Sequence, residues 1–385
     1  MTRMKYKGHT QLYIDGKWMD SVSGATREII YPCDGSAITT VAEGGVEDVD
    51  RAVKAARKAF DEGPWPDTPA AERGRLVEQL ADKVEENREQ LAQLESLDTG
   101  KTVEESRWDM DDIAGIFRYF GQLADKEAGE MISSPVPNTT SRVVHEPIGV
   151  AAQISPWNYP LLQASWKIAP ALAAGCTIVM KPSGQTPLTT IRITELAEEV
   201  GFPQGVVNLV LGSGNTVGAE MSRHPDVDLV SFTGGIIAGK QILKAASDTV
   251  KKVALELGGK NPNIIFADAD FDTAVDFTLN GVFFHAGQIC SAGSRVLVES
   301  SIHDRFVEAL RQRISRIRLG DAFDESTEMG PLISQEHLEK VESYMKLAKE
   351  EGAEIVLGGS RPENPPHKGG FYFAPTLITG VRNDM

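Results

Sequence analysis

The sequence predicts an α/β protein built on a parallel sheet and followed by a second, smaller α/β segment. The first observation behind this prediction is a rhythm that begins at Ile148, in which short apolar runs alternate with helical stretches. Strands and helices that alternate at this spacing are typical of βαβ units. The second observation is a helical pattern over roughly the first 125 residues, and the third observation is a renewed strand–helix pattern after residue 260. The predicted strands of the main sheet are residues 148–154, 176–182, 206–212, 228–233 and 251–257, with helices at 161–173, 186–200 and 237–246.

The segment before the sheet is predicted to be helical and to end in a hairpin. Thr68-Pro69 has the pattern of an N-cap followed by proline at the first helical position. Leucine and valine then recur near helical spacing up to Gly100, and residues 103–125 form another predicted helix. Residues 131–136 and 141–146 are predicted as the strands of a projecting hairpin. Because an exposed hairpin is marginally stable alone, we expect it to pair with another chain or domain.

The second α/β segment is predicted from shorter signals of the same kind. The predicted strands are 263–267, 294–299 and 376–381, and the predicted helices are 303–318 and 335–351. In open parallel sheets, ligands bind beyond the carboxyl ends of the strands, so the loops after the predicted strands are where we expect the chemistry.

Composition and charge exclude several classes of protein. Apolar residues make up 41% of the 385 residues and charged residues 24%, as in an average soluble globular chain. The net charge of −16 argues against nucleic acid or an anionic membrane surface as a partner. The longest nearly apolar run, residues 168–180, is shorter than the ~20 residues that a membrane span needs. We therefore expect a cytoplasmic protein that binds neither nucleic acid nor membranes.

The cysteines and histidines favour neither a disulfide framework nor a metal site. Cys33, Cys176 and Cys290 are far apart in the sequence and form no Cys-x-x-Cys pair. The histidines are scattered, so no metal is expected. His285 could form a catalytic pair with Cys290, but a separation of five residues is poor helical spacing for a contact, and we interpret His285 as structural.

Two glycine-rich loops have more than one interpretation. Gly212-Ser-Gly-Asn-Thr-Val-Gly218 nearly matches a dinucleotide fingerprint, but its last glycine comes one residue late, and an ordinary strand-to-helix turn fits as well. Gly234-Gly-Ile-Ile-Ala-Gly-Lys-Gln241 nearly matches a P-loop. Gln241, however, replaces the Ser or Thr whose hydroxyl binds Mg²⁺, which disfavours a nucleotidase.

Cys290 and Glu256 each have a catalytic and a structural interpretation. Small residues follow Cys290 and would leave room for a substrate, but a lone cysteine can equally be a buried inert thiol. Glu256 stands at the end of a predicted strand and before paired glycines, where a general base facing a ligand is expected. The alternative for Glu256 is a surface salt bridge with Lys260.

Six motifs that occur in a fixed order resolve this ambiguity. They are Pro156-Trp-Asn-Tyr-Pro160, Trp166-Lys-Ile-Ala-Pro-Ala-Leu172, Lys181-Pro-Ser183, Phe232-Thr-Gly234, Leu255-Glu-Leu-Gly-Gly259 and Gly287-Gln-Ile-Cys290. The series resembles the NAD(P)-dependent aldehyde dehydrogenase superfamily from about residue 10 to the end of the chain. Within that superfamily it is most similar to the bacterial betaine aldehyde dehydrogenases, in residues 284–288 and 159–166.

The resemblance implies oxidation of an aldehyde, here betaine aldehyde, to its carboxylic acid; the alternative is a general aliphatic or semialdehyde dehydrogenase. It implies that Cys290 is the nucleophile, and because a free thiol is only a few per cent ionised at pH 7, this thiol must be activated. The side-chain amide of Asn158 and the backbone N–H of Cys290 would stabilise the oxyanion. Glu256 would activate the water that hydrolyses the thioester. Lys167 matches a position with a supporting charge-relay role.

The same resemblance implies a site for NAD or NADP. Lys181 would bind the adenosine ribose, and Gly234 and Gly235 would bind the pyrophosphate at a helix N-terminus. Gly184 stands where NAD-preferring relatives carry Glu, so weaker binding of NAD⁺ and better tolerance of NADP⁺ are expected. The other residues that the resemblance places around the cofactor are Pro156, Trp157, Ser183 and Gly258.

A small-molecule aldehyde is the expected substrate. Tyr159 and Trp166 are candidate walls of an aromatic cage for its trimethylammonium group. The alternative is that both are ordinary core aromatics of a helix.

The predicted organisation also follows the resemblance. Residues 1–128 with 147–256 would bind the cofactor, residues 129–146 would be the oligomerisation hairpin of a homodimer or homotetramer, and residues 257–385 would be the catalytic domain. Family members extend beyond Met385, with a segment that contacts the nicotinamide ribose, so we expect this catalytic domain to be incomplete. A non-catalytic dinucleotide-binding remnant is therefore a second hypothesis.

Overall fold

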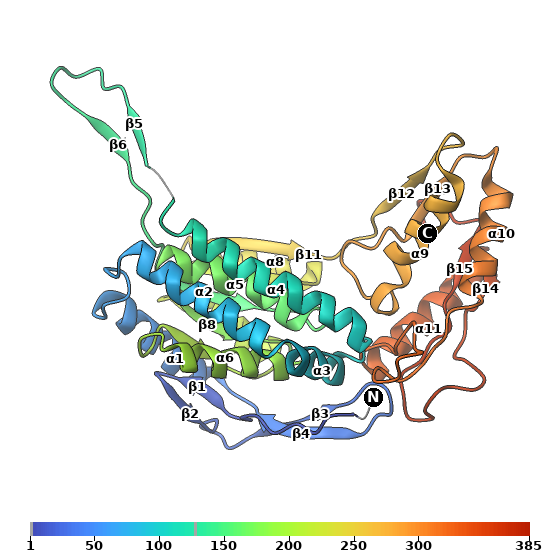
Figure 1. Cartoon of the computed structure of the whole chain (residues 1–385), viewed down its shortest axis with the longest axis horizontal. Helices are drawn as coiled ribbons and strands as arrows, with labels where there is room; N and C mark the ends of the chain where they lie inside the picture. Colours follow the sequence, from blue (N-terminus) through green and yellow to red (C-terminus); the bar gives the residue numbers. More distant parts are fainter. Residues whose placement is uncertain (1–2, 127–128) are drawn as a thin grey trace.

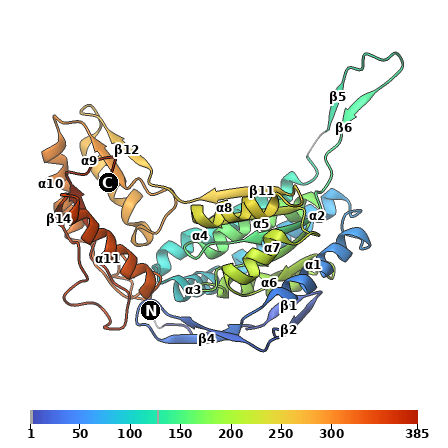
Figure 2. The same cartoon turned by 180° about the vertical axis from the view of Figure 1, so that it is seen from behind.

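The structure is a computed structural model that describes residues 3–126 and 129–385. It consists of a large layered body, a smaller body formed by the C-terminal elements, and a hairpin that projects at the opposite end (Figures 1 and 2). Among the described residues, no helix is both long and apolar enough to cross a membrane.

The large body is built on a seven-stranded sheet of order β11-β10-β7-β8-β9-β1-β2. Strands β7 to β11 pair in parallel and confirm the five predicted strands, whereas β1 and β2 extend the sheet in antiparallel pairing. Every residue of β7 and β8 is buried, as expected for parallel strands with both faces covered. The strands are β1 (Leu12–Ile14), β2 (Lys17–Met19), β7 (Val150–Ile154), β8 (Thr177–Lys181), β9 (Val207–Leu209), β10 (Leu229–Gly234) and β11 (Lys252–Leu257).

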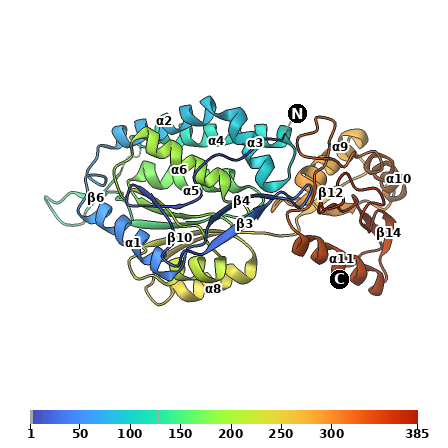
Figure 3. The ribbon, with the colours of Figure 1, turned by 90° about the horizontal axis from the view of Figure 1, so that it is seen from below.

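Helices cover both faces of this sheet. In Figure 3, α2 and α4 lie on one side of the strands and α1 and α8 on the other. The predicted helices are confirmed as α4 (Val103–Leu123), α5 (Pro160–Ala174), α6 (Leu188–Val200) and α8 (Ile236–Ala246). The remaining helical elements of this body are α1 (Val46–Asp61), α2 (Ala70–Glu86), α3 (Arg88–Thr99), the π-turn η1 (Gly214–Gly218) and α7 (Ala219–Arg223).

The prediction for the N-terminal third is wrong in three respects. Residues 12–42 form strands, including an antiparallel pair of β3 (Thr26–Ile30) with β4 (Ala37–Ala42). The stretch that ends at Gly100 is two helices, because Asn87 interrupts it and its side-chain amide donates to the carbonyl of Lys83 at 2.8 Å. Thr68 is not the N-cap, since its hydroxyl donates to the carbonyl of Pro64 and α2 begins only at Ala70.

The smaller body has its own apolar core, which includes Phe306, Leu310 and Val275. Helix α9, which the sequence pattern did not predict, supplies part of this core. Its N-cap is the side chain of Asp270, which accepts from the N–H of Thr273 at 2.9 Å. The elements of this body are β12 (Pro262–Ile265), α9 (Phe271–Phe283), the 3₁₀ turn η2 (Phe284–Gly287), β13 (Arg295–Val298), α10 (His303–Ile314), α11 (Gln335–Glu350), β14 (Glu354–Leu357) and β15 (Leu377–Thr379). The assignment of cofactor and catalytic roles to the two bodies stays a prediction.

The projecting hairpin consists of β5 (Glu130–Ile132) and β6 (Ser141–Val143), which pair in antiparallel register. Its apolar side chains face solvent, and Met131 is 80% exposed. Its strands are shorter than predicted, and its role in oligomerisation stays a prediction.

Candidate active site

Cys290 is exposed, whereas Cys33 and Cys176 are buried. The interpretation as a buried inert thiol is therefore wrong for Cys290 and fits the other two. The backbone carbonyl of Cys290 accepts from the side-chain amide of Asn261 at 2.9 Å, which fixes the chain at this residue.

The loop before Cys290 has an unusual backbone. His285, Ala286 and Gly287 in turn η2 all adopt left-handed conformations, with φ of 48°, 53° and 75°. A non-glycine residue in this region costs roughly 1–2 kcal/mol. Such a loop persists only when the surrounding contacts hold it in place.

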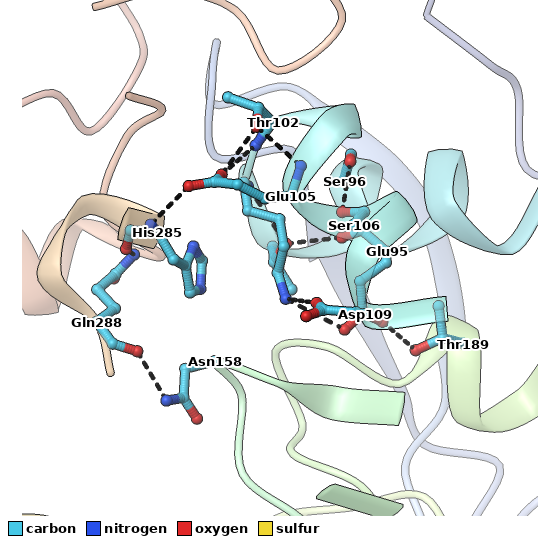
Figure 4. A network of polar contacts seen from close by, with 12 residues as sticks. Glu95, Ser96, Thr102, Glu105, Ser106, Asp109, Asn158, Thr189, His285 and Gln288 are labelled. Atoms are coloured by element: carbon cyan, nitrogen blue, oxygen red, sulfur yellow. Dashed lines mark hydrogen bonds and ion pairs between the residues drawn. The ribbon is translucent and has the colours of Figure 1, made fainter. Parts of the chain in front are cut away.

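Asn158 lies beside this loop. Its side-chain amide donates to the carbonyl of Gln288 at 2.7 Å (Figure 4). Gln288 is buried, and its own side-chain oxygen accepts from the N–H of Ile333 at 3.0 Å. Because a primary amide carries two N–H donors, Asn158 retains one for a substrate oxygen.

Glu256, Lys167 and Thr233 come together at the end of β10 and β11. The strand register places Glu256 opposite Thr233. The buried ammonium of Lys167 donates to the hydroxyl of Thr233 at 2.7 Å, and this hydroxyl donates to Gln163 at 3.1 Å. Burial lowers the pKa of Lys167 to about 8, and the negative charge of nearby Glu256 opposes this effect. The amine can therefore exchange a proton near neutral pH.

The neighbourhood of Glu256 does not favour the salt bridge with Lys260. The ammonium of Lys260 donates to the carbonyl of Gly259 at 3.3 Å. Glu256 itself is exposed on β11 and faces the region of Lys167.

Lys181 is buried at the end of β8. Its ammonium donates to the carbonyl of Pro182 at 2.8 Å, and burial, together with the charge of Arg27, lowers its pKa to about 8. A small pocket nearby is lined by Ser183 and Gly184 on one side and by Arg27 and Glu43 on another.

Arg27 and Glu43 form a bidentate ion pair in this pocket, with N···O distances of 2.5 and 2.6 Å. A Cβ at Gly184 would lie 3.3 Å from the guanidinium carbon of Arg27. Position 184 therefore faces Arg27 in its pair with Glu43, and as a glycine it has no side chain to add a charge.

The glycines between β10 and α8 leave open space at a helix N-terminus. The N–H of Gly258 donates to the carbonyl of Gly234 at 3.3 Å, so these two residues lie side by side. A Cβ at Gly235 or Gly258 would meet nothing within 4 Å. Helix α8 has neither a side-chain cap nor an acidic residue in its first turn, so its first N–H groups are free to bind an anion.

The aromatic candidates lie on α5. Tyr159 is its N-cap, and Trp166, which is 46% exposed, follows nearly two turns later on the same side. The ammonium of Lys101 lies 4.2 Å from the ring centroid of Tyr159, and His285 meets the same ring edge-on at 5.7 Å.

Burial lowers the pKa of His285 well below its usual value, which fits its structural interpretation. Trp157 contacts His337, with ring centroids 5.1 Å apart.

Comparison with known proteins decides the family. The profile of the aldehyde dehydrogenase family matches residues 18–385. The chain belongs to the aldehyde dehydrogenase family. This membership confirms the resemblance, and it identifies the protein as an oxidoreductase.

The proteins to which this chain is similar include the betaine aldehyde dehydrogenases of two bacteria. The betaine aldehyde dehydrogenase of Bacillus subtilis is 58% identical over 97% of this chain and 76% of its own length. An aldehyde dehydrogenase of Emericella nidulans is 43% identical over 99% of this chain and 76% of its own length. A crystal structure of betaine aldehyde dehydrogenase from Staphylococcus aureus in complex with NAD⁺ is 60% identical and superposes with a TM-score of 0.97 over 98% of this chain and 75% of that chain. This agreement confirms the predicted fold class.

The structure also adds site residues that the sequence analysis missed. Thr233 links Lys167 to Gln163, and its only sequence signal was its place in the Phe-Thr-Gly motif. Arg27 and Glu43 had no local signal, because they reach the pocket from strands near the N-terminus that were not predicted.

Proposed function

We propose that this aldehyde dehydrogenase oxidises betaine aldehyde to glycine betaine with NAD⁺ or NADP⁺, through a covalent adduct on Cys290. The observation that carries the proposal is the exposed Cys290 on a loop whose neighbouring carbonyl orients the amide of Asn158. The 58% identity to the Bacillus subtilis enzyme supports the choice of aldehyde.

The first step is the attack of the Cys290 thiolate on the carbonyl carbon of the aldehyde. A C–S bond forms, and the carbonyl electron pair moves to oxygen. The free N–H of Asn158 and the backbone N–H of Cys290 donate to this oxyanion. One such donor is worth about 3–4 kcal/mol in transition-state stabilisation.

The hydride of the adduct carbon must leave to give a thioester, and a bound cofactor would supply its acceptor. Hydrolysis of that thioester then needs a base. Glu256 takes a proton from water, the hydroxide attacks the acyl carbon, and the C–S bond breaks to return the thiolate and release the acid. Lys167, with its pKa lowered to about 8 by burial, can exchange a proton near Glu256, and the hydroxyl of Thr233 holds its ammonium in place.

The residues fit a dinucleotide at the carboxyl ends of the parallel strands. Lys181 would hold the adenosine ribose, the N-terminus of α8 after Gly234 and Gly235 would hold the pyrophosphate, and the open space at Gly258 would admit the nicotinamide. When bound, the cofactor supplies the acceptor for the hydride of the aldehyde carbon. The near-match to a P-loop is thereby explained without Mg²⁺, and the nucleotidase alternative is not favoured.

The test of this function is a time course of reduced cofactor at near-stoichiometric enzyme, with betaine aldehyde and NAD⁺ or NADP⁺ in parallel. Steady turnover with either cofactor supports the proposal. A folded sample with neither a burst nor turnover contradicts it and favours a dinucleotide-binding protein without this activity.

We expect wild-type protein to discriminate between NAD⁺ and NADP⁺ by less than about 100-fold in kcat/KM, or about 2.7 kcal/mol. Position 184 has no carboxylate to accept ribose hydroxyls or repel a 2′-phosphate, and it faces Arg27. Gly184→Glu should shift the ratio towards NAD⁺ by about tenfold or more. Gly115→Glu, which adds the same charge at an exposed site in α4, is the control. An unchanged ratio in Gly184→Glu would reject the role of position 184.

Removing the indole of Trp166 should raise KM for betaine aldehyde by about 2- to 30-fold, since one cation–π contact is worth about 0.5–2 kcal/mol. Tyr159→Ala should act in the same direction. The neutral analogue 3,3-dimethylbutanal should show no such change, and Tyr119→Ala, at an exposed tyrosine of α4, is the matched control. Unchanged KM in both cage variants would remove the cage and leave two ordinary helix aromatics.

The assembly and the location of the protein are parts of the same proposal. We expect a homodimer or homotetramer in the cytoplasm, with the β5–β6 hairpin at the interface. The exposed apolar side chains of the hairpin, such as Met131 and Ile132, support this expectation.

A further inference from the structure

Glu105 connects the start of α4 to the loop before Cys290. Its side chain is buried, and its two oxygens have different partners. One oxygen accepts from the N–H and the hydroxyl of Thr102, at 2.8 and 2.9 Å, and so closes the capping box of α4. The other accepts from the backbone N–H of His285 at 2.7 Å (Figure 4). One carboxylate therefore serves a helix terminus and a loop that lie 180 residues apart in the chain.

The contact between Glu105 and His285 lies where the backbone conformation of the loop is unfavourable. His285 begins the three-residue left-handed stretch, and a left-handed conformation is unfavourable for His285 and Ala286. Gln288 anchors the far end of the stretch through Ile333 and Asn158. The carboxylate of Glu105 anchors the near end, and a hydrogen bond to a charged acceptor is stronger than one between neutral groups.

We propose that Glu105 is a positioning residue for the reaction. By holding the backbone of His285, it fixes the path of the chain to Cys290 and the carbonyl of Gln288 that orients Asn158. This inference rests on the proposed function, which assigns the chemistry to Cys290 and Asn158.

The test is Glu105→Gln. A glutamine offers one acceptor oxygen and one NH₂ donor, so it can satisfy either Thr102 or His285 but not both. Glu104→Gln removes the same charge from the same helical turn, where the side chain is exposed and pairs with Arg107, and it is the matched control. Thr102→Ala weakens the cap of α4 and leaves the contact to His285, which separates helix stability from loop position.

Three quantities are measured for each variant: Tm, kcat with KM, and the rate at which iodoacetamide alkylates Cys290, read by mass spectrometry. Glu105→Gln should lower kcat by up to about 100-fold, the effect of a misplacement of about 1 Å, with little change in KM for the cofactor. It should also change the alkylation rate. Thr102→Ala should lower Tm and keep kcat, and Glu104→Gln should match wild type. Ala286→Gly, which favours a left-handed backbone, should restore part of the kcat of Glu105→Gln.

A kcat and an alkylation rate equal to those of wild type in both Glu105→Gln and Glu105→Leu, which offers no acceptor to either partner, would overturn the inference. If Glu105→Gln does not fold, Ala286→Val disturbs the same loop with α4 intact, and an unchanged kcat in that variant would overturn it. Failure of the proposed function looks different: wild-type protein then lacks turnover, or Cys290→Ala keeps it, while the alkylation comparison still reports on the loop.

Discussion

Replacing Cys290 with alanine is expected to reduce aldehyde oxidation by about 10⁵-fold or more, the scale on which enzymes lose activity when a covalent nucleophile is removed. The reason is chemical: without the thiol no adduct forms, and the amide of Asn158 has no oxyanion to stabilise. The measurement is reduced-cofactor formation, followed both as a burst at near-stoichiometric enzyme and in the steady state. Both phases should disappear together.

Cys176→Ala is the matched control for this variant, because it removes a thiol that is buried away from the solvent. It should retain the burst and the steady rate, with at most a modest loss of stability from the small cavity. Binding of the cofactor, measured as a thermal shift, should survive in Cys290→Ala. Turnover by Cys290→Ala within tenfold of wild type would mean that another group carries the chemistry.

The sequence was most informative where strands are buried on both faces. The apolar runs of β7 and β8 have all of their residues buried, and such runs were read correctly as parallel strands. β1, β2 and β3 were not predicted, because each is only three to five residues long. All residues of β1 are buried, whereas those of β2 and β3 range from exposed to half-buried or buried and have mixed polarity. The helix α9 was not predicted although its sequence carries the usual signals. Asp270 is a standard N-cap, and the apolar residues that pack in the core of the smaller body recur at helical spacing: Phe271, Ala274, Val275, Leu279 and Phe283.

In the candidate site, too, some residues are indicated by local sequence patterns and others are not. Glu256 and Lys181 stand at the ends of predicted strands, whereas Cys290 was singled out by the small residues that follow it and by the resemblance to the family; the roles of all three stay predictions. The contact between Glu105 and His285 could not be predicted in this way. An acidic residue in the first turn of a helix is explained locally by capping, and nothing local indicates that its second oxygen reaches a loop from the smaller body.

Glu256→Gln should separate the two halves of the reaction. Glutamine keeps the shape of the side chain and cannot accept a proton, so thioester hydrolysis should slow by about 10²–10⁴-fold. The attack of Cys290 and the oxidation that follows precede this step, so a burst close to one reduced cofactor per site should remain. Glu28→Gln, at an exposed position of β3, is the control for the loss of one negative charge and should turn over normally. A normal steady rate in Glu256→Gln would mean that another group activates the water. Loss of the burst as well would mean that this carboxylate is needed earlier, to take the proton from the thiol of Cys290, with Lys167 as the nearby group that can exchange a proton.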